Sequence, residues 1–534
     1  MGKAYLLCLI LVSFSVCLFL GCDNSKKEPD EMVKGHGAKQ EVPSGNVRNG
    51  GVFKIGWSST SSKFGDPLDL RGPGADFMSM ACQTLIAYTD KPGVFEPLLA
   101  ESWELAPDKT SYTFHLRKGV KFHDGSPFNA EVVKWNHERV LASNRPTMQR
   151  IKSIEIINDY TIKYHISEWD NTVLNDFRGG ASIIISRVAF EKNGIEWVLT
   201  NPIGTGPFIL YDYKRSSYHK YKRNKDYWQK GLPYLDGVEI HSITDPMTQL
   251  AAFKKGEMHA LREIDVVMAE EIEKLGNYNI EFISGGHMIL WFNNTSRESY
   301  MSDLRVREAL EYAVNKEEIA LSLGKGYVNP IYEILFGAHA AGNPGTTPRK
   351  YDPDKARKLL DEAGCPAKMK MTLTTVTKFY TDFVVALQDD LAKVGIELTI
   401  NRLEPATWRE SVFNPVVPNH LLYDRQRGGT ASLLQIIKED FYSSSIYFPG
   451  VKRPEVWDKL ITRALMAENP GKMIEYLDEV ERKGYEEAMF VPLWDAPDIV
   501  VTDSSVKFDK SKRGSVWYAG GNPLLRMEYV WFEP

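Results

Sequence analysis

The feature that most constrains the fold is an apolar helical stripe that runs directly into a strand. The stripe consists of Phe383, Val384, Leu387, Leu391 and Val394. After Gly395, the residues Ile396, Leu398 and Ile400 alternate with polar ones, which is the period of a half-buried strand. A helix, a glycine and a strand in this order are typical of a partly parallel sheet covered by helices. The chain is therefore expected to have an α/β fold.

The same two periodicities place other elements along the chain. Strands are expected at 51–57, 112–116 (resuming at 120–122), 154–157, 160–166, 207–210 and 238–240. A helix is expected over 306–313, and another from the N-cap Asp352 to Gly364. The first part of the chain is rich in strands and the second mixes helices with strands. At 534 residues, this pattern favours more than one lobe.

Composition narrows the class of protein. Hydrophobic residues make up 43% of the chain and charged residues 25%, enough for large cores, so a wholly disordered chain is excluded. The formal charge of −5 gives no concentrated positive field, and nucleic acid is not expected as a partner.

The amino terminus has the pattern of an export signal. Residues 5–20 are uncharged and mostly apolar, too short to span a bilayer comfortably but the right length for a secretory signal. The run ends in Leu-Phe-Leu-Gly-Cys, which resembles a bacterial lipobox, with Phe19 where Leu is usual. We therefore expect a signal peptide over 1–21 and a lipidated Cys22. An ordinary cleaved signal is the alternative.

The polar residues 22–49 are interpreted as a flexible tether, because so little apolar surface cannot offset the entropy of ordering. Asp23 resembles a retention signal, so the anchor is expected on the outer face of the cytoplasmic membrane. Beyond the signal and the anchor, only Cys82 and Cys365 remain, and both are expected to be free, buried thiols; a disulfide between them is the alternative.

No common catalytic motif occurs, whether G-x-S-x-G, H-E-x-x-H, C-x-x-C or a P-loop, so the chain is not expected to be an enzyme. Gly204 and Gly206 are interpreted as a sharp backbone turn. His123-Asp124 is interpreted as a structural turn, because the spacing of nearby histidines does not fit a compact metal site. No cofactor and no metal are expected.

The segment 424–429 (Asp-Arg-Gln-Arg-Gly-Gly) is interpreted as a loop between a strand and a helix. Its guanidinium groups, Arg425 and Arg427, would match a carboxylate, and Asp424 precedes them. The alternative is a surface loop held by its own Asp–Arg pairs. Arg305 and Arg307 are interpreted as solvated helix charges.

Several aromatic residues occur at expected strand or loop edges, where they would serve either as core or as ligand platforms in one cleft. They are Trp57, Phe64, Trp291, Trp408 and Trp494.

Four ordered blocks of sequence resemble the extracytoplasmic solute-binding proteins of ABC importers, family 5, the oligopeptide/dipeptide/nickel-binding class. These blocks lie at 96–125 (EPLLAESW…YTFHLRKGVKFHDG), 204–228 (GTGPF…NKDYW), 293–310 (NNT…LRVREAL) and 351–364 (YDPDKA…EAG). The resemblance covers nearly everything after the tether.

This resemblance implies a two-lobed periplasmic-binding-protein fold, type II and cluster C-like, with an accessory domain on the first lobe and two or three crossing strands as a hinge. The implied divisions are lobe I over 50–75, 185–290 and 494–534, the accessory domain over 76–184, and lobe II over 291–493. The first block would then be accessory-domain scaffold that does not touch the ligand.

The resemblance also implies which segments lie near a ligand. Residues expected there are Phe64, Arg262, Glu263, His287, Trp291, Trp408, Asp424, Arg425, Arg427, Thr430, Trp494 and Asp495. Peptide-binding members resemble W-x-A-D, whose acid receives an α-ammonium group. Here Arg427 stands at the Trp and Thr430 at the acid. A buried cation without a carboxylate is costly, so this departure puts the usual peptide mode in doubt.

The expected function is capture of a peptide or similar small solute for a membrane permease by a monomeric, lipid-anchored, extracytoplasmic protein. The alternatives are a non-peptide anionic solute (a carboxylate, an opine-like molecule or a metal chelate), or a binding or sensory protein without transport.

Overall fold

The computed structural model describes residues 34–35, 47, 49–59, 61–70, 73–89, 94–143, 147–283, 286–333, 335, 345–376, 381–414, 417–427, 433–453, 455–509 and 526–533. The signal and Cys22 lie outside this range. Of the expected tether, residues 34–35 form the short strand β1 (Lys34–Gly35) beside Trp103 and Glu104.

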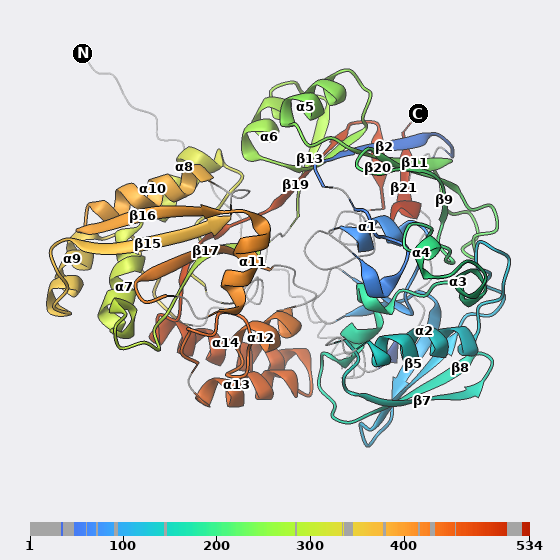
Figure 1. Cartoon of the computed structure of the whole chain (residues 1–534), viewed down its shortest axis with the longest axis horizontal. Coiled ribbons are helices and arrows are strands. Elements are labelled where there is room, and N and C mark those ends of the chain that lie inside the picture. The colour runs from blue at the N-terminus through green and yellow to red at the C-terminus, as the bar shows by residue number, and fades with distance from the viewer. Residues whose placement is uncertain are drawn as a thin grey trace, which may run out of the picture.

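The chain forms two lobes side by side, with the second lobe at the left of Figure 1 and the first at the upper right. The first lobe contains a seven-stranded sheet of order β13-β19-β12-β2-β11-β10-β9. Its strands are β2 (Val52–Trp57), β9 (Phe208–Lys214), β10 (Tyr218–Arg223), β11 (Gly237–Ser242), β12 (Ala260–Ile264), β13 (Tyr278–Ile283) and β19 (Asp498–Asp503). Its helices are α1 (Gly74–Ser79), α3 (Arg187–Asn193), α4 (Ile195–Val198), α5 (Pro246–Lys254) and α6 (Val266–Glu273). The short strand pairs are β3 (Ile86–Tyr88) with β4 (Phe95–Pro97), and β20 (Val506–Phe508) with β21 (Val530–Phe532).

A five-stranded antiparallel sheet lies below this lobe in Figure 1 and carries the first sequence block. It contains β1, β5 (Ala100–Leu105), β6 (Ser111–Leu116), β7 (Ile151–Asn158) and β8 (Thr161–Ile166), with α2 (Ala130–Ala142) beside it. The expected hairpin of 154–166 is present as β7 and β8. Residues 120–122 form no named strand, only a single bridge between Lys121 and Pro127.

The second lobe is built on a mixed five-stranded sheet of order β16-β15-β17-β14-β18. Its strands are β14 (Gly286–Phe292), β15 (Met369–Val376), β16 (Ile396–Leu403), β17 (His420–Arg427) and β18 (Val491–Asp495). Its helices are α7 (Leu304–Ala313), α8 (Lys316–Gly324), α9 (Pro353–Glu362), α10 (Thr381–Ala392), α11 (Pro405–Phe413), α12 (Leu433–Phe441), α13 (Glu455–Leu465) and α14 (Pro470–Glu486). The predicted helix–glycine–strand unit is α10 followed by β16, and β16 pairs with β15 in parallel, as the sequence indicated.

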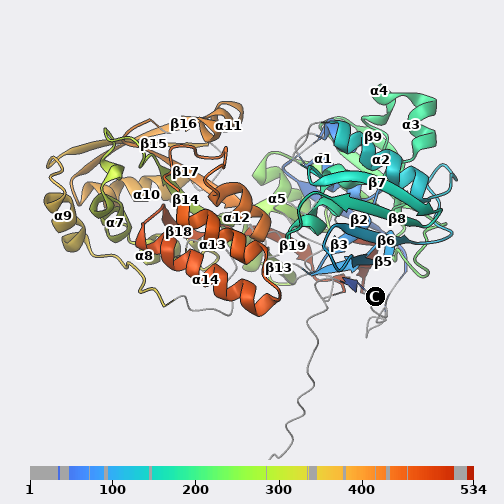
Figure 2. The same ribbon diagram turned by 90° about the horizontal axis from the view of Figure 1, so that it is seen from below.

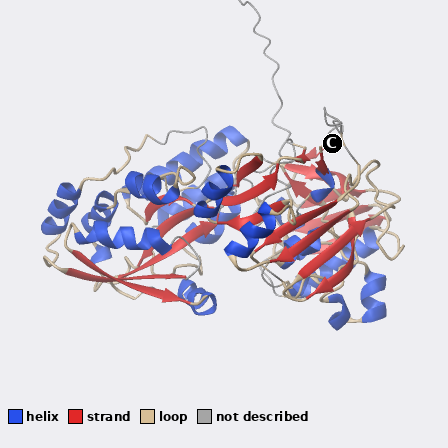
Figure 3. Cartoon of the chain, turned by 90° about the horizontal axis from the view of Figure 1, so that it is seen from above, coloured by secondary structure: helices blue, strands red, loops and turns tan. Residues whose placement is uncertain are grey.

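Within the described ranges, the chain crosses between the two large sheets twice. β13 ends at Ile283 in the first sheet and β14 begins at Gly286 in the second, while β18 ends at Asp495 and β19 begins at Asp498. Figure 2 shows β13 and β19 between the lobes and β14 and β18 within the second lobe, and Figure 3 shows strands along the line that joins the lobes. The sheets therefore change near 284–285 and 496–497. The boundaries that we expected at 290/291 and 493/494 fall inside strands of the second sheet.

The backbone bends at Thr205–Pro207, as expected of a sharp turn, and close backbone approach gives a further reason for Gly204 and Gly206. A Cβ on Gly204 would clash with the Ala81 carbonyl oxygen and with Cys82, and a Cβ on Gly206 would lie 2.6 Å from the Ala81 carbonyl carbon. Only glycine allows the segments 204–206 and 81–82 to approach each other at that distance.

Candidate functional site

A cavity of about 540 Å³ lies at the junction of the lobes, near the second crossing. Its lobe I wall consists of Glu263, Ile264, Asp265, Val266, Val267, Asp498 and Ile499, with Pro497 in the crossing itself. Its lobe II wall consists of Ser322, Leu323, Lys325, Asp382, Phe383 and Arg425. This volume is in the range of small-molecule sites, and both lobes shape it.

Glu263 enters the cavity from an irregular position in β12. The register of β12 with β19 shifts between Arg262 and Ile264, and Glu263 has a φ of 55°, in the left-handed region that a non-glycine residue rarely adopts. Its carboxylate accepts hydrogen bonds from the hydroxyls of Ser58 (2.9 Å) and Ser59 (2.6 Å), just beyond β2. The bulge and the two serines thus fix one carboxylate in the lobe I wall.

An ion pair joins the lobes across the cavity. Nη2 of Arg425, on β17, lies 2.9 Å from Oδ1 of Asp498, at the start of β19. Both side chains are largely buried, with exposed fractions of 18% and 13%. Low exposure strengthens the attraction between the two charges relative to water. Arg425 is therefore engaged by the chain itself.

A second group of charges lies behind Glu263. The guanidinium of Arg262 stacks 4.0 Å from the ring of Trp57, and the residue is 2% exposed. Burial raises the pKa of Asp76 from 3.8 to about 7; Arg262 opposes this rise, and the charges of Glu263 and Asp498 add to it. Burial is the largest cause of this rise, and the positive charge of Arg262 offsets part of the repulsion from Glu263 and Asp498.

The remaining charged residues of the cavity stand at helix ends. Asp265 caps α6 by accepting from the backbone N–H of Met268 at 2.7 Å, and Asp382 is in the first turn of α10. Lys325 ends α8 in a left-handed conformation, with a φ of 55°. Each carboxylate offsets the positive end of its own helix.

The lobes also meet at two places outside the cavity. Asp170, after β8, accepts from the Lys438 ammonium of α12 at 2.6 Å, and Asn171 donates to two carbonyls at the end of α13, Leu465 (backbone N–H, 2.9 Å) and Ala467 (side chain, 3.1 Å). On the hinge side, the rings of Phe282 and Tyr327 stack at 5.3 Å. The segment after β8 therefore contacts lobe II directly.

Four of the aromatic residues expected near the ligand are buried in this conformation. Phe64, Trp291 and Trp494 are fully buried and Trp408 is 8% exposed. Each of the first three packs on other rings: Phe64 on Tyr213, Trp291 on Phe448, and Trp494 on Phe383. Trp57 likewise is 1% exposed. In this conformation these rings are core residues and offer no surface to a ligand.

The segment that we interpreted as a loop is largely strand. β17 continues through Asp424, Arg425 and Gln426 to Arg427, because the buried strand β14 pairs with it along its whole length. Alternation along the strand directs Asp424 and Arg425 to opposite faces, and only Arg425 lines the cavity. The Arg427 side chain and Thr430 lie outside the described parts of the structure.

The other predicted residues stand beside the cavity. Asp495 accepts hydrogen bonds from the backbone N–H (2.6 Å) and side chain (2.8 Å) of Asn329, which ties it to lobe II. His287 is 7% exposed, and burial lowers its pKa to about 3, so the ring is neutral. The junction therefore unites Glu263 and Arg425 in one cavity, with Arg262 next to it.

The structure also tests the residues that we set aside. His123 bonds the Gly206 carbonyl (3.0 Å), and Asp124 accepts from Ser126 and Ser186, as expected of a structural turn. Cys82 and Cys365 are both free, although Cys365 is only partly buried.

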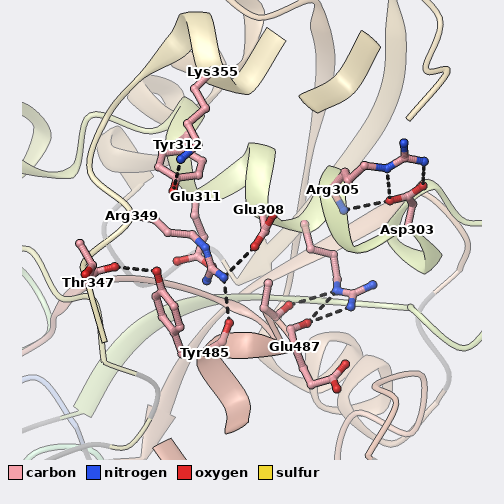
Figure 4. Close-up of polar contacts among 12 residues, drawn as sticks. Asp303, Arg305, Glu308, Glu311, Tyr312, Thr347, Arg349, Lys355, Tyr485 and Glu487 are labelled. Atoms are coloured by element: carbon pink, nitrogen blue, oxygen red, sulfur yellow. Dashed lines mark hydrogen bonds and ion pairs between the residues drawn. The ribbon is translucent and has the colours of Figure 1, made fainter. Parts of the chain in front are cut away.

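The prediction that Arg307 is a solvated helix charge is wrong. This side chain is 5% exposed and donates to the carbonyls of Met301, Ser302, Glu487 and Ala488. Arg305 is exposed on the same helix and binds Asp303. Figure 4 shows that pair to one side of the buried group in which Arg349 meets Glu308 and Glu311.

Sequence reasoning missed Asp265, Lys325, Asp382 and Asp498. Lys325 stands between two glycines, a turn signal that would have placed it at a helix end. Asp265 precedes an apolar helix as an N-cap, but this pattern indicates a helix start and not a site. No sequence pattern identified Asp498 as a site residue.

Within the described ranges, no group of three or more His, Cys, Asp or Glu side chains is arranged to hold a metal ion. The described helices include none whose length and apolar character would allow it to cross a membrane.

Two lobes joined by two crossings, with a cavity walled by both, define the class of two-lobed binding proteins. The model of the bacterial extracellular solute-binding proteins, family 5, matches residues 94–422. The chain belongs to this family.

The chain is similar to the glutathione-binding protein GsiB of Salmonella choleraesuis, with 32% identity over 325 residues, 59% of this chain and 62% of that protein. The match thus spans less than two thirds of the relative. Among solved structures, the fold is similar to the periplasmic binding protein DppA of Helicobacter pylori in complex with the peptide STSA (TM-score 0.75, 24% identity, 91% of this chain and 99% of that chain). It is also similar to NikA of Brucella suis in complex with Fe(III)-EDTA (TM-score 0.76, 23% identity, 90% and 100%).

Proposed function

We propose that the protein is the solute-binding component of an ABC importer, which captures a peptide or similar small solute between its lobes and delivers it to a membrane permease. The observation that carries this proposal is the cavity of about 540 Å³ with walls from both lobes. The family membership and the glutathione and peptide named for the relatives support a small solute as cargo.

The mechanism follows from this geometry. A ligand in the cavity touches both walls only when the lobes are together, so it binds the closed form more tightly and shifts the population toward it. The two crossings supply the pivot. Binding alone achieves capture, and the proposal includes no bond-breaking step.

The engagement of Arg425 bears on the ligand class. An anionic ligand that bound Arg425 would have to compete with Asp498, 2.9 Å away. This competition favours the peptide-like solute over the purely anionic one, for which Arg425 was the main candidate group.

In the same proposal, Cys22 carries the acyl anchor, and the protein acts as a monomer at the outer face of the cytoplasmic membrane. Acyl chains hold a protein at a membrane through their buried methylenes. Replacing Cys22 with Ser should move the protein from the membrane fraction to the soluble fraction. A Cys22→Ser protein that still sediments with membranes and carries acyl mass would contradict this part.

Native mass spectrometry of the mature domain tests the function. We expect one small molecule per chain, released on denaturation, and a smaller radius of gyration by X-ray scattering when it is returned to the emptied protein. A chain that carries nothing and keeps its radius with glutathione and with the peptide STSA would refute the proposal.

A further inference from the structure

One edge of the first sheet concentrates positive charge in a chain that is acidic overall. β9 and β10 form a hairpin there, with β9 as the outermost strand of the sheet. Residues 209–230, which span this hairpin and the turn after it, hold seven Lys or Arg residues and two carboxylates, although the whole chain has a formal charge of −5. Figure 1 shows β9 on the side of the first lobe that faces away from the second lobe.

Most of these cations are not neutralised by the chain itself. Two of the seven are paired: Lys220 with Asp212 at 3.7 Å, and Arg223 with Asp236 at 3.1 Å. The other five are exposed and have no ion pair within the described ranges: Lys214, Arg215, Lys222, Lys225 and Lys230. Like charges this close together act as one positive field on anything that approaches the hairpin.

The strand geometry brings part of this charge to one face. His219 and Tyr221 of β10 are buried in the core, so Tyr218 and Lys222 point to the opposite side of the sheet. Lys214 of β9 lies directly across from Tyr218. A strand of this length extends about 20 Å. The hairpin therefore presents a basic face of that length, with a tyrosine ring among its lysines.

We propose that this basic hairpin face binds a bilayer surface of anionic phospholipids. Clusters of four to eight Lys or Arg residues are attracted to such surfaces, with a gain of about fivefold in binding for each cation. Tyrosine is enriched at membrane–water interfaces, and Tyr211 of β9 is 54% exposed beside Lys214 and Arg215. The inference goes beyond the proposed function, because it assigns a second ligand to a surface outside the interlobe cavity.

The kind of charge favours lipid over a protein partner. Four of the five unpaired cations are lysines, whose flexible side chains carry a point charge without the fixed geometry of a guanidinium group. Lysine is depleted in protein–protein interfaces, whereas a fluid anionic bilayer asks only for positive charge within reach. The acyl anchor in the proposed function would keep this face near a membrane, where even a weak attraction orients the protein.

Vesicle binding tests the inference. The protein is the mature chain, residues 22–534, with Cys22→Ser, which carries no acyl group. Vesicles of equal parts phosphatidylcholine and phosphatidylglycerol are compared with vesicles of phosphatidylcholine alone in a sedimentation assay. We expect binding to the anionic vesicles that is at least about tenfold tighter than to the neutral ones and that weakens as salt rises, because salt screens exposed charges.

A fourfold variant then assigns this binding to the hairpin: Lys214→Gln, Arg215→Gln, Lys222→Gln and Lys225→Gln. Loss of four cations should weaken binding to the anionic vesicles about a hundredfold or more. The matched control has the same net charge and neutralises four exposed lysines of lobe II, Lys350, Lys358, Lys368 and Lys370. It should change vesicle binding less than about threefold, because charges far from the bilayer are screened.

Three results would overturn the inference: equal binding to the two kinds of vesicle, no binding to either, or equal weakening by the two variants. Cytoplasmic membranes of the source cell, compared before and after protease digestion, separate lipid from a membrane protein. Binding that is lost on digestion, without binding to anionic vesicles, would mean that a protein docks on this face, and the lipid inference would fail.

The cargo is tested separately. The hairpin variant should bind the co-purified solute as the parent chain does, because its substitutions lie outside the cavity. A chain that binds anionic vesicles but no solute would refute the proposed function alone. A chain that binds solute but no anionic vesicle would refute this inference alone.

Discussion

Replacing Lys438 with Met should loosen the contact between α12 and the segment after β8, and so disfavour the form in which the lobes are together. Lys438 reaches from α12 to Asp170, after β8, 2.6 Å away, and their side chains are 33% and 9% exposed. Although burial by itself would raise the pKa of Asp170, Arg150 and Lys438 hold it below its usual range. Asp170 also keeps Arg150 (2.5 Å) and the Thr172 hydroxyl (2.6 Å) as partners in the variant.

The expected loss of free energy is moderate, because Asp170 keeps other partners when the Lys438 ammonium is removed. Loss of a fully buried partner would cost about 3–5 kcal/mol, and loss of an exposed one less than about 1 kcal/mol. Because Arg150 remains and Lys438 is one third exposed, we expect about 1–2 kcal/mol. The open form lacks this contact, so the closure constant should fall about five- to thirtyfold. Where the closed form is the minority without ligand, the apparent Kd rises by the same factor.

Calorimetric titration of the co-purified solute measures that change, and X-ray scattering measures the open fraction. Lys472→Met is the matched control, because the Lys472 ammonium pairs with Glu475 in its own helix. Lys438→Arg should restore most of the affinity. A Lys438→Met protein with a Kd within twofold of wild type and an unchanged scattering curve would refute the claim that the Lys438–Asp170 ion pair stabilises the closed form.

Three further predictions concern stability. Because the pKa of Asp76 is raised to about 7 in the folded state and is near 3.8 in the unfolded state, the free energy of unfolding falls as pH rises between these values. Asp76→Asn should remove this fall and add on the order of 2 kcal/mol to the free energy of urea unfolding at pH 8, and parallel pH profiles of the two proteins would contradict this prediction. Gly204→Ala should destabilise by about 1–3 kcal/mol, since its Cβ meets backbone and the Cys82 sulfur (2.5 Å); an unchanged Tm would show that the chain there yields. Arg307→Met should cost about 3 kcal/mol by leaving buried carbonyls without a donor, while the exposed Arg305→Met changes less than about 0.5 kcal/mol; equal effects on Tm would count against the burial argument.

Local periodicity predicted those helices and strands whose apolar residues lie on a single face that packs against the core. The stripe before Gly395 became α10, and the strand after it became β16, because both bury their apolar sides against the same sheet. The segment 424–427 failed for the opposite reason. Its polar residues and the following glycines indicate a loop, but pairing with the buried β14 overrides that preference.

The site was only partly accessible from sequence. Glu263 and Arg425 were expected near the ligand, and the structure brings them into one cavity. The contribution of Asp498 depends on a crossing that returns the chain to lobe I after more than two hundred residues, and no local pattern encodes that return. The sequence left open whether the aromatic residues belong to the core or to a ligand site, because a tryptophan in a strand has the same sequence pattern whether its ring faces a cleft or a core; in this conformation the rings are buried.

The position of β19 has a consequence for the order in which this protein can be assembled. β19 lies inside the first sheet, between β13 and β12, although it begins only at Asp498. Until that strand arrives, β12 and β13 have open edges, and β2, near the start of the body, lacks the complete sheet around it. Contacts between residues this far apart in sequence form slowly. A nascent chain thus stays incompletely folded until nearly all of it has been made, which would suit the export that the amino-terminal sequence predicts.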